Sequence, residues 1–80
     1  DETAAEFITA LCGAENIEDV DASITRLRVS VKAPDQVSKA SLKNLGATEV
    51  FEVGGGVQAV YGAKAILYKN AINAQLGIDD

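Results

Sequence analysis

The sequence predicts an α+β fold in which three helices pack on one face of a four-stranded antiparallel sheet. Segments of helical and strand periodicity follow one another in the order helix, two strands, helix, two strands, helix. Within each pair of strands the connection is short, which favours a hairpin and therefore antiparallel pairing. The strands are apolar on one side only, so we expect the helices to cover a single face of the sheet.

Length and composition indicate one folded domain. Eighty residues can bury a single hydrophobic core but not two. The chain is 48% hydrophobic and 24% charged, which is typical of a globular domain and not of a disordered one. Its apolar runs are too short to span a membrane.

The first predicted helix covers residues 3–12. Phe7 and Leu11 lie four residues apart and belong to its apolar stripe. Thr3 is the expected N-cap residue, and Gly13 is expected to end the helix.

The first predicted hairpin joins strands at residues 16–21 and 24–31. In the second of these strands Arg26 and Arg28 alternate with apolar residues, which is the period of a half-buried strand. Both arginines are therefore expected to leave the same, exposed face of the sheet.

The second half of the chain repeats this pattern. A helix over about residues 39–45 is expected to begin after an N-cap at Ser38. Strands follow at residues 49–53 and 57–61, with three glycines between them that suit a tight turn. The last predicted helix covers residues 63–76.

Several kinds of chemistry are disfavoured by the composition. The net charge of −5 argues against a nucleic-acid partner, whose phosphates the overall field would repel. The chain has no histidine, and its one cysteine, Cys12, fits a small, partly buried side chain better than a reactive thiol. The acidic residues show no metal-ligand spacing, so we expect neither a metal site nor a cofactor.

The strongest candidate site combines a hydroxyl with two guanidinium groups. Ser23 immediately precedes the strand that carries Arg26 and Arg28, and guanidinium groups suit phosphate oxygens. Gln58 lies in a strand that can neighbour the arginine strand, where its amide can help to hold an anion. From the residues alone, an exposed polar strand with a turn serine remains the alternative interpretation.

The segment Asp-Ala-Ser-Ile-Thr-Arg-Leu-Arg-Val at residues 21–29 resembles the active-site segment of a known family. That family is the B domain of enzyme II in the phosphoenolpyruvate-dependent sugar phosphotransferase system, glucose/N-acetylglucosamine group. The similarity covers nearly the whole chain, because three further segments match in order: residues 15–17, 42–47 and 56–62. The resemblance implies the same α+β fold and a single B domain over residues 1–80, excised from a larger membrane-bound enzyme II.

The resemblance also implies a role as a phosphoryl carrier. A family cysteine at the position of Ser23 accepts phosphate from a phosphohistidine on the A domain and passes it to a sugar at the membrane-embedded C domain. Arg26 and Arg28 correspond to arginines that steady the phosphoryl group. The remaining phosphoryl-binding residues are expected to be Asp21, Thr25 and Gln58. The implied location is the cytoplasmic side of the plasma membrane, as part of a bacterial transporter.

The chain departs from the family at the nucleophile, because Ser23 stands where the family has cysteine. An alcohol is far less acidic than a thiol, so the same arginines generate much less of the ionised nucleophile. We therefore expect the site geometry to be intact and phosphoryl transfer to be strongly impaired, in either an engineered or a divergent member. The alternative function is a non-catalytic binding or regulatory module on the same fold.

Overall fold

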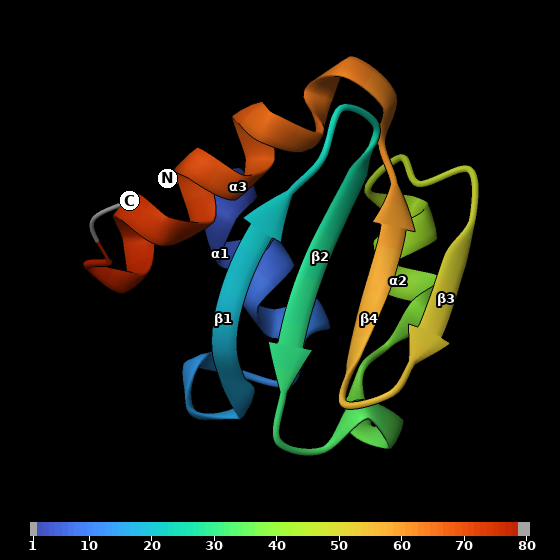
Figure 1. Cartoon of the computed structure of the whole chain (residues 1–80). Coiled ribbons are helices and arrows are strands. Elements are labelled where there is room, and N and C mark those ends of the chain that lie inside the picture. The colour runs from blue at the N-terminus through green and yellow to red at the C-terminus, as the bar shows by residue number, and fades with distance from the viewer. Residues whose placement is uncertain (1, 79–80) are drawn as a thin grey trace.

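The computed structural model describes residues 2–78 of the chain and confirms the predicted architecture (Figure 1). Over these residues it contains three α-helices and four strands: α1 (Glu2–Ala10), β1 (Ile17–Ala22), β2 (Arg26–Val31), α2 (Lys39–Asn44), β3 (Val50–Val53), β4 (Gly56–Val60) and α3 (Ala65–Leu76). The strands pair antiparallel in the order β1-β2-β4-β3, so the two hairpins meet at β2 and β4. Figure 1 shows α1 and α2 behind the sheet and α3 along its β1 side.

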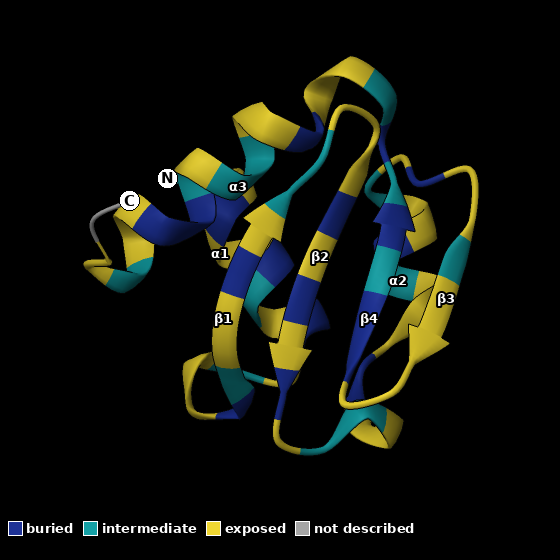
Figure 2. Cartoon of the chain, viewed as in Figure 1, coloured by how far each residue is buried: buried dark blue, intermediate teal, exposed yellow. Residues whose placement is uncertain are grey.

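Alternation along β2 separates the two faces of the sheet. Leu27, Val29 and Val31 are buried, while the residues between them are exposed (Figure 2). The buried side chains pack with Phe7 and Leu11 of the first helical segment in the hydrophobic core. Because successive strand side chains point to opposite faces, the polar residues of β2 lie together on the uncovered face.

The ends of the helices confirm one predicted cap and correct others. Ser38 accepts a hydrogen bond from the Ser41 amide at 3.1 Å and is the N-cap of α2. Thr3 was predicted as the N-cap of the first helix, but α1 already includes Glu2, so Thr3 lies inside the helix. The last helix begins at Ala65, because the residues just before it form a 3₁₀ turn.

The first helix ends earlier than its apolar pattern predicts. Cys12, and not only Gly13, has a positive φ (73°), which turns the chain out of the helix. Two backbone bonds close this turn, from the Cys12 amide to the Thr9 carbonyl at 3.0 Å and from the Gly13 amide to the Ile8 carbonyl at 2.8 Å. This bonding pattern is a Schellman motif, which supplies donors to carbonyls left over at the helix end.

Asn16 ties the start of β1 to the segment after β2. Its side-chain amide donates to the Leu11 carbonyl at 2.9 Å and to the Ala33 carbonyl at 3.3 Å, and its side-chain oxygen accepts from the Ala33 amide at 2.8 Å. The residue is only 9% exposed. A buried polar group with several partners of this kind fixes the path of the chain around it.

An aromatic cluster packs the end of β4 against α1 and α3. Tyr61 packs edge-on against Phe7 and Tyr68, with ring centroids 5.3 and 5.1 Å away. Its hydroxyl donates to the Leu42 carbonyl at 2.7 Å. Burial, together with the neighbouring Tyr68, raises the pKa of Tyr61, so its phenol remains a hydrogen-bond donor at neutral pH.

At Gly56 the backbone of β2 leaves no room for a side chain on β4. A Cβ at this position would overlap the Val29 carbonyl oxygen in the neighbouring strand. We expect Gly56→Ala to push the strands apart and to lower the free energy of unfolding by about 1–3 kcal/mol, the usual range for overpacking. Denaturant titration will measure this difference.

Gly55→Ala is the matched control for that substitution. A Cβ on Gly55 meets nothing within 4 Å, and this residue has no positive φ. Its stability should stay close to that of the unsubstituted chain. Equal losses of stability in the two variants would mean that the close β2–β4 contact is not what requires glycine at position 56.

Candidate functional site

The turn between β1 and β2 is closed by backbone hydrogen bonds. The Ser23 amide donates to the Arg26 carbonyl at 2.9 Å. The Thr25 carbonyl accepts from the amides of Tyr61 and Gly62, both at 3.0 Å. The half-buried Ser23 therefore lies on a turn that is fastened to the end of β4.

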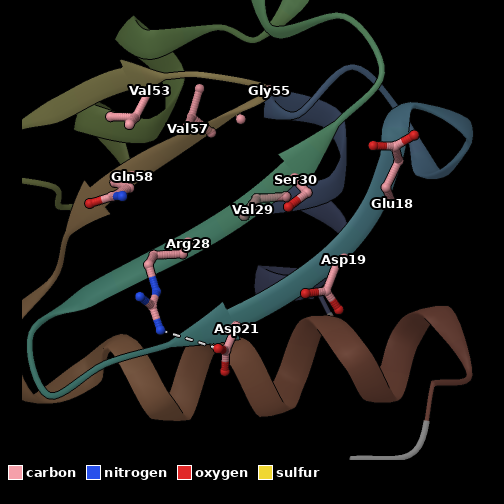
Figure 3. Close-up of a pocket in the computed structure, with 11 residues that line it drawn as sticks. Glu18, Asp19, Asp21, Arg28, Val29, Ser30, Val53, Gly55, Val57 and Gln58 are labelled. Atoms are coloured by element: carbon pink, nitrogen blue, oxygen red, sulfur yellow. Dashed lines mark hydrogen bonds and ion pairs between the residues drawn. The ribbon is translucent and has the colours of Figure 1, made fainter.

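A row of side chains crosses the uncovered face of the sheet beside this turn. Asp21 of β1 is opposite Arg28 of β2, Arg28 is opposite Gln58 of β4, and Gln58 is opposite Phe51 of β3. Figure 3 shows Asp21, Arg28 and Gln58 on the same face. The register thus brings one residue from each strand into a continuous line.

Arg28 forms an ion pair within this row. Its Nη2 atom lies 3.2 Å from Oδ2 of Asp21 (Figure 3), and the two side chains are 47% and 58% exposed. Solvent screens a pair with this exposure, so its contribution to stability is at most about 1 kcal/mol. The contact orients Arg28 toward β1.

Arg26 has uncharged partners and extends toward β4 and β3. Its Nη1 atom donates to Oε1 of Gln58 at 3.1 Å, and its guanidinium carbon lies 5.5 Å from the centroid of the Phe51 ring. A cation above an aromatic face is a favourable contact that leaves the positive charge uncompensated. The two arginines thus differ in electrostatic environment, because Arg28 is paired with a carboxylate and Arg26 contacts an amide oxygen and an aromatic ring.

The predicted site residues therefore fall into two groups. On the sheet face, side-chain contacts form two separate pairs, Arg26 with Gln58 and Arg28 with Asp21. Ser23 and Thr25 lie on the adjoining turn, where the structure places them through backbone hydrogen bonds.

Sequence reasoning missed Phe51 as a partner of Arg26. The signal was present, because alternation along β3 places Phe51 on the face opposite the core-packed Val50. Identifying the contact also required the pairing of β3 with β4 and of β4 with β2, which depends on residues far apart in the chain.

A groove of about 510 Å³ lies on the same face, on the far side of Arg28 from the turn. Its lining includes the backbone of Gly55 and Gly56, and it also holds the acidic side chains of Glu18 and Asp19 (Figure 3). Arg28 is the basic residue among those that line it. An anion is therefore more favourably placed at the turn than in this groove.

Two general properties bear on the chemistry of the described part of the chain. Among residues 2–78 there is no group of three or more His, Cys, Asp or Glu side chains arranged to hold a metal ion. None of the helices formed by these residues has the length and apolar character needed to cross a bilayer.

Comparison with known proteins relates this chain to a family. A family model described as phosphotransferase system, EIIB, matches residues 5–37, which include Ser23 and both arginines. The chain is 47% identical over 72 residues to the PTS system glucosamine-specific EIICBA component of Bacillus subtilis (strain 168). It is 52% identical over 58 residues to the PTS system glucose-specific EIICBA component of Staphylococcus saprophyticus.

These alignments cover 90% and 72% of this chain but only 11% and 9% of the two relatives, so the chain spans about a tenth of their length. The fold is also similar to a crystal structure of one domain of the PTS system IIabc component from Clostridium difficile. That match has a TM-score of 0.80 and 25% identity, and it covers 98% of this chain and 82% of the other. The sequence segment, the sheet topology and these relatives agree, and the chain belongs to the EIIB family, the B domain of enzyme II of the sugar phosphotransferase system.

Proposed function

We propose that this domain carries a phosphoryl group during sugar uptake, accepting it from a phosphohistidine on an A domain and passing it to a sugar. The observation that carries the proposal is the placement of Ser23 on the fastened turn next to Arg26 and Arg28. These two are the only arginines in the sequence, and they leave the same face of one strand. Charge-assisted contacts from guanidinium groups stabilise the negative charge of a transferring phosphoryl group.

The chemical step would exchange one bond to phosphorus for another. The Ser23 oxygen attacks phosphorus, the phosphorus–nitrogen bond of the phosphohistidine breaks, and the imidazole nitrogen keeps the bonding pair. The hydroxyl proton passes to the departing imidazole, which leaves as neutral histidine, because this chain contains no histidine of its own to take the proton first. This requirement supports the expectation that the serine form transfers phosphate slowly.

The relatives indicate the setting of this step. Their names, glucosamine-specific and glucose-specific EIICBA components, join C, B and A parts. We therefore propose that the A domain is the phosphoryl donor, that a membrane C domain presents a hexose or amino-hexose, and that residues 1–80 act as the B domain on the cytoplasmic side. Nucleic acid is not a proposed partner.

One observation favours a second candidate function. Serine at position 23 suits a module that docks a phosphorylated partner without accepting its phosphate, as a regulator would. Such a module would use the same arginines to contact the phosphohistidine. The Ser23→Cys substitution described in the Discussion separates the two functions.

Arginine substitutions test the location of the site. We expect Arg26→Ala and Arg28→Ala each to weaken the binding of sulfate and phosphate by about 10- to 150-fold, because a charge-assisted hydrogen bond contributes about 1.5–3 kcal/mol. The stability of folding should hardly change, since both side chains are exposed. Anion titrations followed by amide NMR shifts of the Ser23 turn measure the affinity.

Lys43→Ala is the control for this experiment, because it removes the same charge from an exposed position on α2. It should bind anions as the unsubstituted chain does. If all three variants respond equally to sulfate, then the binding reflects net charge and the proposed site is wrong.

A further inference from the structure

We propose that Asp21 is an internal competitor for the phosphoryl group, holding Arg28 in the empty site and keeping the affinity for free phosphate low. The inference rests on the proposed function, but it assigns Asp21 a role distinct from that of a phosphoryl ligand. Its basis is the ion pair between Arg28 and Asp21 at 3.2 Å on the uncovered face of the sheet.

The ion pair is built into the backbone ladder. Asp21 and Arg28 are directly opposite each other in the antiparallel pairing of β1 with β2. The turn that joins the strands is held by the Ser23 to Arg26 hydrogen bond. The carboxylate therefore cannot move far from Arg28 when an anion arrives, and the pair forms again when the anion leaves.

Asp21 is also chemically unsuited to contact the phosphoryl group directly. An ionised carboxylate has only hydrogen-bond acceptors, as do the oxygens of a phosphoryl dianion. The negative charges of the carboxylate and of a phosphoryl group in contact with it repel each other. Asp21 and the phosphoryl group therefore compete for the Arg28 guanidinium, and contact with one weakens its contact with the other.

The two arginines would consequently act in sequence. Arg26 is held by the amide of Gln58 and the ring of Phe51, so its charge is available to an approaching anion. Arg28 becomes fully available as Asp21 is displaced. Solvent exposure of both partners makes this displacement possible without unfolding any part of the sheet.

Such competition suits a carrier. A site that bound inorganic phosphate or sulfate tightly would be blocked by the free ions and would release its phosphoryl group slowly. A carboxylate that takes Arg28 back lowers the affinity for both the free ion and the bound group. The phosphoryl group is then held by its covalent bond and by Arg26, with a contribution from Arg28 that Asp21 reduces.

The test compares two aspartates of the same strand. Asp21→Asn removes the charge and preserves the shape, and we expect it to bind sulfate and phosphate about two- to fivefold more tightly, the range set by an exposed ion pair. Asp19→Asn changes the net charge equally, and both aspartates line the groove on this face of the sheet, but Asp19 is opposite Ser30 and not Arg28. Asp19→Asn should therefore gain less affinity for sulfate and phosphate than Asp21→Asn at equal ionic strength.

A double variant isolates the role of Arg28. In an Arg28→Ala background, Asp21→Asn should give no larger gain than Asp19→Asn does. Weaker anion binding by Asp21→Asn, or gains equal to those of Asp19→Asn, would overturn the inference. If Arg26→Ala and Arg28→Ala still weakened binding in the same titration, then the proposed function would stand without it. Equal binding by the unsubstituted chain and both arginine variants would overturn the two together.

Discussion

Ser23→Cys should accept a phosphoryl group from a histidine-phosphorylated A domain about 100- to 10,000-fold faster than the serine form, the range that loss of a general base typically costs. A thiol is a few per cent ionised near neutral pH without help, and two nearby guanidinium groups increase that fraction. The Ser23 hydroxyl has to lose its proton during the attack, and the chain has no histidine to take it. Quenched-flow sampling with intact-mass detection measures both rates.

Two controls make this comparison specific. Cys12→Ser in the same background removes the other thiol, which is exposed at the end of the first helix and not partly buried as the sequence predicts, and it should leave the gain unchanged. Ser23→Ala should remove any uptake that the serine form shows. If Ser23→Cys binds the phosphorylated A domain but gains no phosphate, then the domain is a docking module and not a carrier.

Asn16→Ala should lower the free energy of unfolding by about 2–4 kcal/mol, since each of its hydrogen bonds contributes about 1 kcal/mol and buried partners are left unsatisfied. Its side chain bonds to the Leu11 carbonyl and to both polar backbone groups of Ala33. Water reaches these groups poorly, because the side chain that would be removed is nearly buried. Chemical denaturation of the variant and of the unsubstituted chain will give the difference.

Asn70→Ala is the matched control for this loss. Asn70 is exposed within α3, where alanine has the higher helix propensity, so its stability should be unchanged or slightly increased. A loss as large at position 70 as at position 16 would show that the buried hydrogen bonds of Asn16 are not responsible. Unchanged stability in Asn16→Ala would lead to the same conclusion.

The fold was predictable because local patterns and packing agree. Alternation along β2 matches its alternating burial, and Ser38 and Gly77 stand where helix caps are needed. Where the predicted end of a helix was wrong, the cause is local. At the end of α1 the positive φ belongs first to Cys12, a residue type that gives no such signal.

The candidate site was predictable as a set of residues but not as a set of contacts. The pairing of Asp21 with Arg28 follows from the length of the turn that starts at Ser23. That turn contains no glycine that would have indicated its length. The contact of Arg26 with Phe51 depends on two further strand pairings. The difference between Arg28, which is paired with a carboxylate, and Arg26, which is not, could therefore be identified only from the assembled sheet.

The most direct test of the carrier role is to locate the transferred phosphate. The Ser23→Cys, Cys12→Ser variant is incubated with a histidine-phosphorylated A domain, and its peptides are then sequenced by mass spectrometry under conditions that preserve phosphothiols. We predict one phosphoryl group per chain at position 23, with much less when Arg26→Ala is added. Phosphate at any other residue, or none at all, would contradict the assignment of the Ser23 turn as a phosphoryl-transfer site.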